Sequence, residues 1–220
     1  MIKGFIFDLD GVITDTAEYH FLAWQELAKG LGIQIDRSFN EKLKGISRLE
    51  SLETILDYGD LATMYTPAEK IALATEKNTH YIELIQNITP VDLLPGISQL
   101  LHDLKEQHFK IALASASKNG PFILDKLEIS SFFDAIVDPE TLTNGKPDPE
   151  VFIKAAQFIN LPVTETVGIE DAEAGIISIN SAGMFSVGVG NPESMKNADY
   201  LVTDTAQLSL AKILEKANKN

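Results

Sequence analysis

The sequence contains no cysteine, which excludes disulfide bonds and thiolate metal ligands. Its longest stretch without a charged residue, residues 174–192, includes serine, asparagine and glycine and is too polar to span a membrane. The first residues do not show a basic segment followed by an apolar core, so no secretory signal is expected. Internal repeats and low-complexity segments are also absent. We therefore expect a cytoplasmic protein that has no membrane partner.

Basic residues are scarce: 18 lysines and arginines face 32 acidic residues, which gives a net charge of −14. A nucleic-acid partner is disfavoured, because such binding depends largely on neutralising phosphates. A small phosphorylated substrate remains compatible, because a few well-placed cations suffice locally. With 220 residues, 45% of them hydrophobic, the chain can form one globular domain or a domain with an insertion.

Two aspartates follow the first apolar stretch. Residues 2–7 are nearly all apolar and predict a strand buried on both faces of a parallel sheet. Asp8 and Asp10 come next, at the carboxyl end, where open α/β sheets bind ligands. Residues two apart in extended chain point the same way, and two close carboxylates repel unless a cation or a shared proton relieves them. The spacing therefore predicts a metal ion or one protonated acid.

A tight hairpin at Asp10-Gly11 is the alternative interpretation, because Asp-Gly between apolar residues is a common hairpin turn. Residues 14–16 disfavour it, since Thr-Asp-Thr is typical of a helix start. Apolar residues at helical spacing then predict helices through to about residue 86, with no strand. Capping-box patterns begin at Ser38, Ser47 and Thr66.

The pattern changes after Pro90. Apolar runs predict strands at residues 110–114, 135–137, 166–169, 185–189 and 200–202. Helical patterns alternate with them, opening after Pro95-Gly96 and continuing at 121–127, 149–159, 172–181 and 206–217. This alternation predicts an α/β fold with a parallel sheet and helices on both faces. We expect one α/β domain formed by residues 1–15 and 92–220, interrupted by an all-helical domain of residues 16–91 that acts as a lid and excludes water.

Polar groups follow other predicted strands. Residues 115–119 read Ser-Ala-Ser-Lys-Asn and suit an anion, Lys146 lies in a loop before a helix, and Glu170-Asp171 could complete an oxygen-rich Mg²⁺ site. Each of these features also has an ordinary interpretation. Residues 115–119 can be a polar turn, Lys146 a solvated lysine, and Glu170-Asp171 acids that neutralise a helix dipole. Together they supply a nucleophile, cations and metal carboxylates, which are the groups that phosphoryl transfer needs.

This order of residues resembles the haloacid dehalogenase superfamily over essentially the whole chain. The resemblance implies a Rossmann-like core with an inserted helical cap domain. It implies that Asp8 is a nucleophile that becomes an aspartyl phosphate, and that Asp10 is the general acid/base. Ser115 and Lys146 would hold the phosphoryl group. One Mg²⁺ per chain would be bound by Asp8, Asp10 (through its backbone carbonyl), Glu170 and Asp171.

Residues 8–20, 44–48 and 114–119 are similar to the sugar-phosphate mutases of this superfamily. This implies an isomerase of carbohydrate metabolism that interconverts β-D-glucose 1-phosphate and D-glucose 6-phosphate through β-glucose 1,6-bisphosphate. Arg48 suits a second phosphate because guanidinium binds phosphate bidentately. Core packing is an alternative role for Trp24, and a surface position is one for His20. The expected substrate-binding residues are Thr16, His20, Trp24, Lys44, Gly45, Ile46, Ser47, Arg48, Ser51, Lys77, Ser115, Ala116, Ser117, Lys118 and Asn119.

Two other functions stay open on this evidence. A sugar-phosphate phosphatase of the same superfamily would share every core residue and differ only in whether water reaches the aspartyl phosphate. A non-catalytic binding module is disfavoured by the intact acids and lysine. In either enzymatic case the partner is a small sugar phosphate, and the chain is expected to be a monomer.

Overall fold

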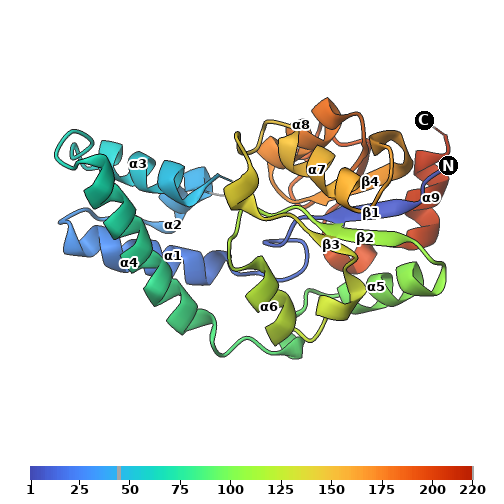
Figure 1. Ribbon diagram of the computed structural model, residues 1–220, viewed down its shortest axis with the longest axis horizontal. Helices are drawn as coiled ribbons and strands as arrows, with labels where there is room; N and C mark the ends of the chain where they lie inside the picture. The colour runs from blue at the N-terminus through green and yellow to red at the C-terminus, as the bar shows by residue number, and fades with distance from the viewer. Residues whose placement is uncertain (44–45, 220) are drawn as a thin grey trace. The chain divides into compact units, whose positions relative to one another are not determined.

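The computed structural model describes residues 1–43 and 46–219 and divides into two compact units (Figure 1). One unit consists of residues 1–15 and 88–220, and the other of residues 16–87. The boundary expected from the sequence lay at residue 91. No helix among the described residues is both long and apolar enough to cross a membrane.

The first unit contains a six-stranded parallel sheet in the order β3-β2-β1-β4-β5-β6, which confirms the predicted α/β class. A hairpin at Asp10-Gly11 is excluded, because β1 pairs in parallel with β2 and β4. The strands are β1 (Gly4–Phe7), β2 (Lys110–Leu113), β3 (Ala135–Ile136), β4 (Thr166–Glu170), β5 (Phe185–Val189) and β6 (Tyr200–Val202).

Strand β1 lies in the middle of the sheet, and all four of its residues are buried. The pairing continues past the strand ends: the Asp8 N–H donates to the Ile169 carbonyl at 3.0 Å, and the Ala114 N–H donates to the Phe7 carbonyl at 2.8 Å. The carboxyl ends of β1, β2 and β4 are therefore adjacent, and the polar residues that follow them share one edge of the sheet.

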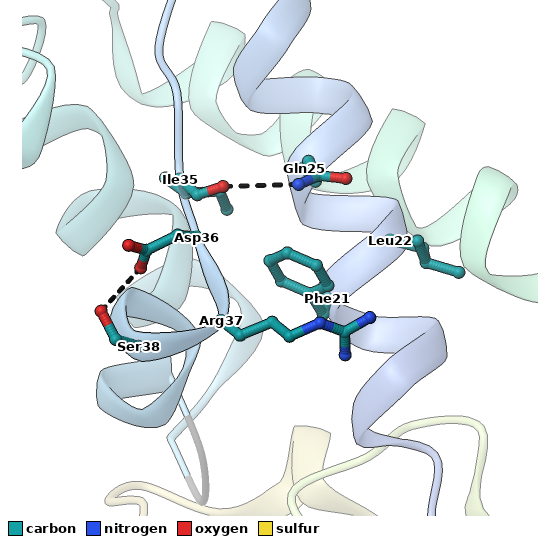
Figure 2. Close-up of a pocket in the computed structure, with 7 residues that line it drawn as sticks. All are labelled: Phe21, Leu22, Gln25, Ile35, Asp36, Arg37 and Ser38. Atoms are coloured by element: carbon teal, nitrogen blue, oxygen red, sulfur yellow. Dashed lines mark hydrogen bonds between the residues drawn. The ribbon is translucent and has the colours of Figure 1, made fainter.

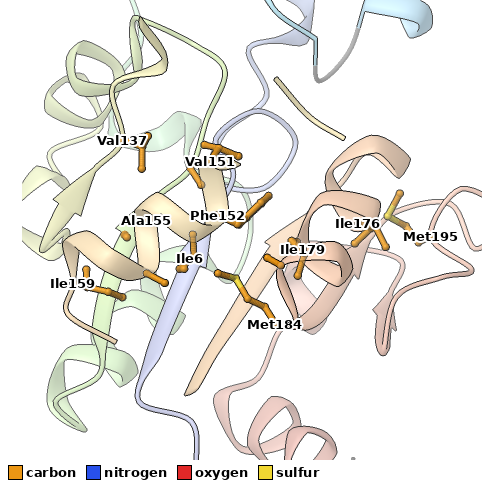
Figure 3. Packing of buried hydrophobic residues seen from close by; sticks show 14 residues of the cluster. Ile6, Val137, Val151, Phe152, Ala155, Ile159, Ile176, Ile179, Met184 and Met195 are labelled. Atoms are coloured by element: carbon orange, nitrogen blue, oxygen red, sulfur yellow. The ribbon is translucent and has the colours of Figure 1, made fainter. Parts of the chain in front are cut away.

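Helices α7 and α8 cover one face of this sheet. Figure 3 shows Phe152 and Ala155 of α7 beside Ile6 of β1, and Ile176 and Ile179 of α8 in the same apolar cluster. Helix α5 contacts β2 and α9. The helices of the unit are α5 (Ile97–Glu106), α6 (Gly120–Lys126), α7 (Glu150–Phe158), α8 (Glu173–Ala182) and α9 (Leu210–Ala217).

The second unit is helical, as predicted, and its described residues contain no strand. Buried residues such as Phe21, Leu52 and Ile55 form its own apolar core. The capping boxes predicted at Ser47 and Thr66 are both present and begin the third and fourth helices. The helices are α1 (Ala17–Gly30), α2 (Arg37–Asn40), α3 (Arg48–Tyr58) and α4 (Pro67–Ile85).

The predicted starts of α2 and α9 were wrong, and those of α6, α7 and α8 each differ by one residue from the observed starts at Gly120, Glu150 and Glu173. Helix α2 is capped by Asp36, whose carboxylate accepts from the Phe39 N–H at 2.8 Å, and not by Ser38. Helix α7 begins at Glu150, one residue late, because Pro149 occupies the cap position. Residues 205–207 form a separate 3-10 turn, so α9 begins only at Leu210. A side-chain hydrogen bond caps the start of α2, whereas Pro149 and Ser209, the cap residues of α7 and α9, form no side-chain cap hydrogen bond.

Candidate active site

Three carboxylates meet at the edge of the sheet where β1 and β4 end. One oxygen from each of Asp8, Glu170 and Asp171 lies within 4.8 Å of the others. Asp171 approaches the turn after β1 so closely that a Cβ on Gly11 would lie 2.1 Å from its Oδ2. Gly11 also has a φ of 76°, which favours glycine. Glycine at position 11 thus makes room for this acidic cluster.

Lys146 joins two of the acids from the loop that precedes α7. Its Nζ donates to Asp8 Oδ1 at 2.6 Å and to Glu170 Oε2 at 2.7 Å, and all three side chains are buried. The Lys146–Pro147 peptide bond is cis. The Lys146 ammonium lies 5.1 Å from the centre of the Phe152 ring, a cation–π contact that also stabilises its position.

Burial and charge perturb these groups strongly. Burial alone would lower the pKa of Lys146, but the negative charges of Asp8 and Glu170 outweigh it and hold that pKa above its usual value. Burial, followed by the charge of Asp8, raises the pKa of Glu170 to about 8. The single ammonium therefore does not offset the negative charge of the cluster, and near neutral pH one acid carries a proton unless a cation binds.

The donor set suits a hard divalent cation. It consists of carboxylate oxygens, the ligands that Mg²⁺ prefers, and no sulfur or imidazole takes part in the cluster. Two carboxylates remain after one is paired with Lys146, so a divalent cation would complete the charge balance. The cluster of Asp8, Glu170 and Asp171 can thus hold a metal ion.

The loop after β2 carries the expected anion-binding residues. Ser115 is buried, and its Oγ accepts from the Ser117 N–H at 3.1 Å, while the Ser117 Oγ accepts from the Asn119 N–H at 3.3 Å. Ala116 lies between them. Lys118 forms an ion pair with Glu140. No sequence pattern indicates Glu140 as this partner, because it lies 22 residues further along the chain.

In the helical unit, His20 and Lys77 form a partly buried contact. Lys77 Nζ donates to His20 Nδ1 at 2.7 Å, and the His20 ring stacks on Tyr81 with 4.0 Å between ring centres. Lys77 also lies 4.7 Å from the centre of the Trp24 ring. Burial, then the positive charges of Lys77 and Arg48, lower the pKa of His20 well below 6.5. The imidazole is therefore neutral at physiological pH.

This pairing predicts a pH-dependent stability. Because the folded protein resists protonation of His20, the unfolded chain binds the proton better, and stability falls as pH drops below about 6.5. We expect the melting temperature of wild type to fall more between pH 7 and pH 5 than that of His20→Gln, in which this titration is removed. Differential scanning calorimetry at both pH values measures the difference. His80→Gln, on α4, is the control and should behave as wild type; equal slopes for His20→Gln and wild type would contradict the assignment.

The other predicted substrate residues of the helical unit lie near the start of α3 or are buried inside the unit. Ser47 is the N-cap of α3, and Arg48 is its first residue. Ser51 donates to the Ser47 carbonyl at 3.0 Å. Trp24 and Thr16 are buried, with Trp24 in the apolar core, and Ile46 is half-buried. Lys44 and Gly45 lie outside the described residues. Substrate contact by this set stays a prediction.

A shallow surface pocket lies elsewhere in the same unit (Figure 2). The polar side chains that line this pocket bind other residues of the unit. Gln25 Nε2 donates to the Ile35 carbonyl at 3.4 Å, and Arg37 lies over the Phe21 ring and pairs with Glu18. None of its lining residues was a predicted site residue. The lining consists of Phe21, Leu22, Gln25, Ile35, Asp36, Arg37 and Ser38.

Comparison with known proteins places this geometry in context. The family model described as haloacid dehalogenase-like hydrolase matches residues 5–189. A beta-phosphoglucomutase from Bacillus subtilis is 56% identical and aligns over 95% of this chain and 92% of its own. The crystal structure of a beta-phosphoglucomutase from Clostridium difficile superposes with a TM-score of 0.98 at 52% identity, covering 100% of this chain and 98% of that one. A phosphorylated carbohydrates phosphatase from Thermotoga maritima is 26% identical over 83% of this chain and 82% of its own.

Proposed function

The chain belongs to the haloacid dehalogenase-like hydrolase family, and from that premise we propose that it is a phosphomutase that interconverts β-D-glucose 1-phosphate and D-glucose 6-phosphate. The 56% identity to a beta-phosphoglucomutase over nearly the whole chain carries this proposal. Phosphatases of the family are also related to this chain, but at far lower identity, such as 26%.

In the proposed reaction, Asp8 already carries a phosphoryl group when β-glucose 1-phosphate binds. In the first transfer, Asp10 removes the proton from the 6-hydroxyl, whose oxygen forms a bond to phosphorus while the bond between phosphorus and Asp8 breaks, which gives β-glucose 1,6-bisphosphate. In the second transfer, an Asp8 oxygen forms a bond to the phosphorus at C1 while the bond between that phosphorus and the C1 oxygen breaks, and Asp10 donates its proton to the leaving oxygen. Glucose 6-phosphate is released, and Asp8 is phosphorylated again. Both transfers are displacements for which a positioned acid and base suffice.

The cation chemistry of this chain supports the same proposal. Lys146, held 2.6 Å from Asp8 Oδ1, is placed to stabilise charge on the transferring oxygens. Asp8, Glu170 and Asp171, with the Asp10 carbonyl, would hold one Mg²⁺. When bound, Mg²⁺ supplies charge neutralisation that lets an anionic carboxylate approach an anionic phosphate. Ser115 and residues 116–119 would bind phosphate oxygens from the end of β2.

The direct test is to incubate the protein with β-glucose 1-phosphate, Mg²⁺ and trace β-glucose 1,6-bisphosphate. Glucose 6-phosphate and free phosphate are measured in the same samples. We expect glucose 6-phosphate to accumulate to equilibrium with little phosphate. Release of one phosphate per sugar phosphate consumed would instead identify a phosphatase.

Arg48 tests how the second phosphate is recognised. The chain has two arginines, Arg37 and Arg48, and only Arg48 lies in a stretch similar to the sugar-phosphate mutases. We expect Arg48→Ala to reduce kcat/KM for β-glucose 1-phosphate by about 10²-fold, because a charge-assisted bidentate contact worth about 2–3 kcal/mol is lost.

Acetyl phosphate, a phosphoryl donor with no distal phosphate, separates this role from a general defect. Arg48→Ala should phosphorylate Asp8 from acetyl phosphate at the rate of wild type. Arg37→Ala is the matched control, because Arg37 is paired with Glu18, and it should leave both reactions unchanged. Unaltered glucose 6-phosphate formation by Arg48→Ala would remove the main support for second-phosphate binding by this residue.

A further inference from the structure

Helix α8 carries two small buried residues on one face, next to the acidic cluster. Gly175 and Ser178 are three residues apart, so their positions lie on the same side of the helix. Both are buried, and Ser178 is 0% exposed. Gly175 lies against the side chain of Glu170, and Ser178 contacts the loop that carries Lys146. Glu170 and Lys146 are the two partners of a buried ion pair in the active site.

Gly175 leaves the space that the Glu170 carboxyl group occupies. A Cβ at position 175 would lie 2.0 Å from Glu170 Cδ and 2.2 Å from Glu170 Oε2. The carboxyl group is fixed from other directions by the Ala172 N–H at 3.1 Å and by Lys146 Nζ at 2.7 Å. Gly175 is not among the positive-φ glycines, so its backbone does not require glycine. The close approach of Glu170 does.

Ser178 fixes the Lys146 loop to the same helix. Its Oγ donates to the Asp148 carbonyl at 2.7 Å, two residues after Lys146 in the chain. Ser178 is fully buried, so its hydroxyl depends on this carbonyl for a hydrogen-bond partner. The first turn of α8 therefore seats Glu170, and its next turn holds the segment from which Lys146 reaches Glu170.

We propose that Gly175 and Ser178 are positioning residues of α8: Gly175 seats the metal-binding carboxylate of Glu170, and Ser178 holds the loop from which Lys146 reaches Asp8 and Glu170. The inference rests on the metal site of the proposed function. Gly175 and Ser178 thereby acquire a role in cation binding and phosphoryl transfer, although they would contact neither the metal ion nor the phosphoryl group. Ordinary core packing, in which any small residue would serve, is the competing explanation.

Gly175→Ala tests the seat for Glu170. We expect Mg²⁺ affinity, measured by isothermal titration calorimetry without sugar phosphate, to fall about tenfold or more, the usual effect of disturbing a group that orients a metal ligand. Gly30→Ala is the matched control: Gly30 also lies in a helix, but a Cβ there meets nothing within 4 Å, and its affinity should equal that of wild type. A Mg²⁺ affinity of Gly175→Ala within twofold of wild type would overturn the proposal.

A double-mutant cycle identifies the group that the added methyl displaces. Gly175→Ala should lower the melting temperature of wild type. In the Glu170→Ala background it should leave the melting temperature unchanged or raise it, because alanine favours helix over glycine. Equal destabilisation in both backgrounds would show that the methyl group clashes elsewhere and would refute the seat for Glu170.

Ser178→Ala tests the other half. We expect kcat at saturating Mg²⁺ and substrate to fall about tenfold, while Mg²⁺ affinity stays within twofold, because the variant frees the Lys146 loop and leaves Glu170 seated. Ser181→Ala, at an exposed position of the same helix, should change neither. An unchanged kcat would refute the role of Ser178. Since Mg²⁺ binding is measured without sugar, a phosphatase outcome in the product assay would reject the proposed function without affecting this test.

Discussion

Asp8→Asn is expected to reduce turnover by about 10⁴-fold or more, the scale on which removal of a nucleophile acts. An amide oxygen is a far weaker nucleophile than a carboxylate, and it cannot form a stable acyl phosphate. Position 8 directly follows β1, and a carboxylate oxygen of Asp8 lies 2.6 Å from Lys146 Nζ. Formation of glucose 6-phosphate by the variant and wild type, measured with the same bisphosphate activator, gives the ratio.

Covalent labelling shows whether this loss reflects the nucleophile. Mass spectrometry after reaction with a phosphoryl donor should place the phosphoryl group on Asp8 in wild type and find none in Asp8→Asn. Lys146 keeps Glu170 as a partner in the variant, so circular dichroism and melting should report a folded protein. A phosphoryl group found on another residue would reject the assignment.

The second large effect is expected for Asp10→Asn. A sugar hydroxyl is a poor nucleophile and a poor leaving group, so its transfer depends on a base in one direction and an acid in the other. Such help contributes about 10²–10⁴-fold, and kcat should fall by that factor. Asp10 follows the nucleophile by two residues, and its side chain is outside the cluster of Asp8, Glu170 and Asp171.

A donor with a good leaving group separates Asp10 from Asp8. When acetyl phosphate donates its phosphoryl group, acetate leaves without needing a proton. Asp10→Asn should therefore still form aspartyl phosphate from this donor at close to the wild-type rate. Rapid-quench measurement of the phosphorylated protein distinguishes the two steps. If phosphorylation by acetyl phosphate fell as steeply as sugar turnover, Asp10 would act in placing Asp8 or the metal ion and not as the acid and base.

The sheet was predictable because each strand is a short apolar run and the first two acids come directly after one of them. Parallel pairing, in the strand order that the structure shows, then places the ends of β1, β2 and β4 side by side. Lys146 was assigned by family resemblance, since its loop precedes α7 and does not directly follow a strand. Its contacts with Asp8 and Glu170 depend on how that loop folds back.

Contacts between distant segments could not be predicted in the same way. No sequence pattern connects Lys118 to Glu140. Ser178 likewise stands in no recognisable motif, and only the structure shows that its hydroxyl donates to the Asp148 carbonyl. The small residues after Asp171 were visible, but only the distance from Gly175 to Glu170 explains why one of them is glycine. The start of α2 was missed for a related reason, because Asp36 and Ser38 are both polar residues able to cap this helix.

The central position of β1 has a consequence for synthesis on the ribosome. Its two neighbours are β2, which begins at Lys110, and β4, which ends at Glu170. The first strand to emerge therefore waits for most of the chain before both of its edges are covered. Meanwhile the contacts inside residues 16–87 are short-range in sequence. During translation, an apolar strand stays unpaired behind a segment able to fold early, so a nascent chain that stops before β4 exposes β1 to chaperones and to other unpaired strands.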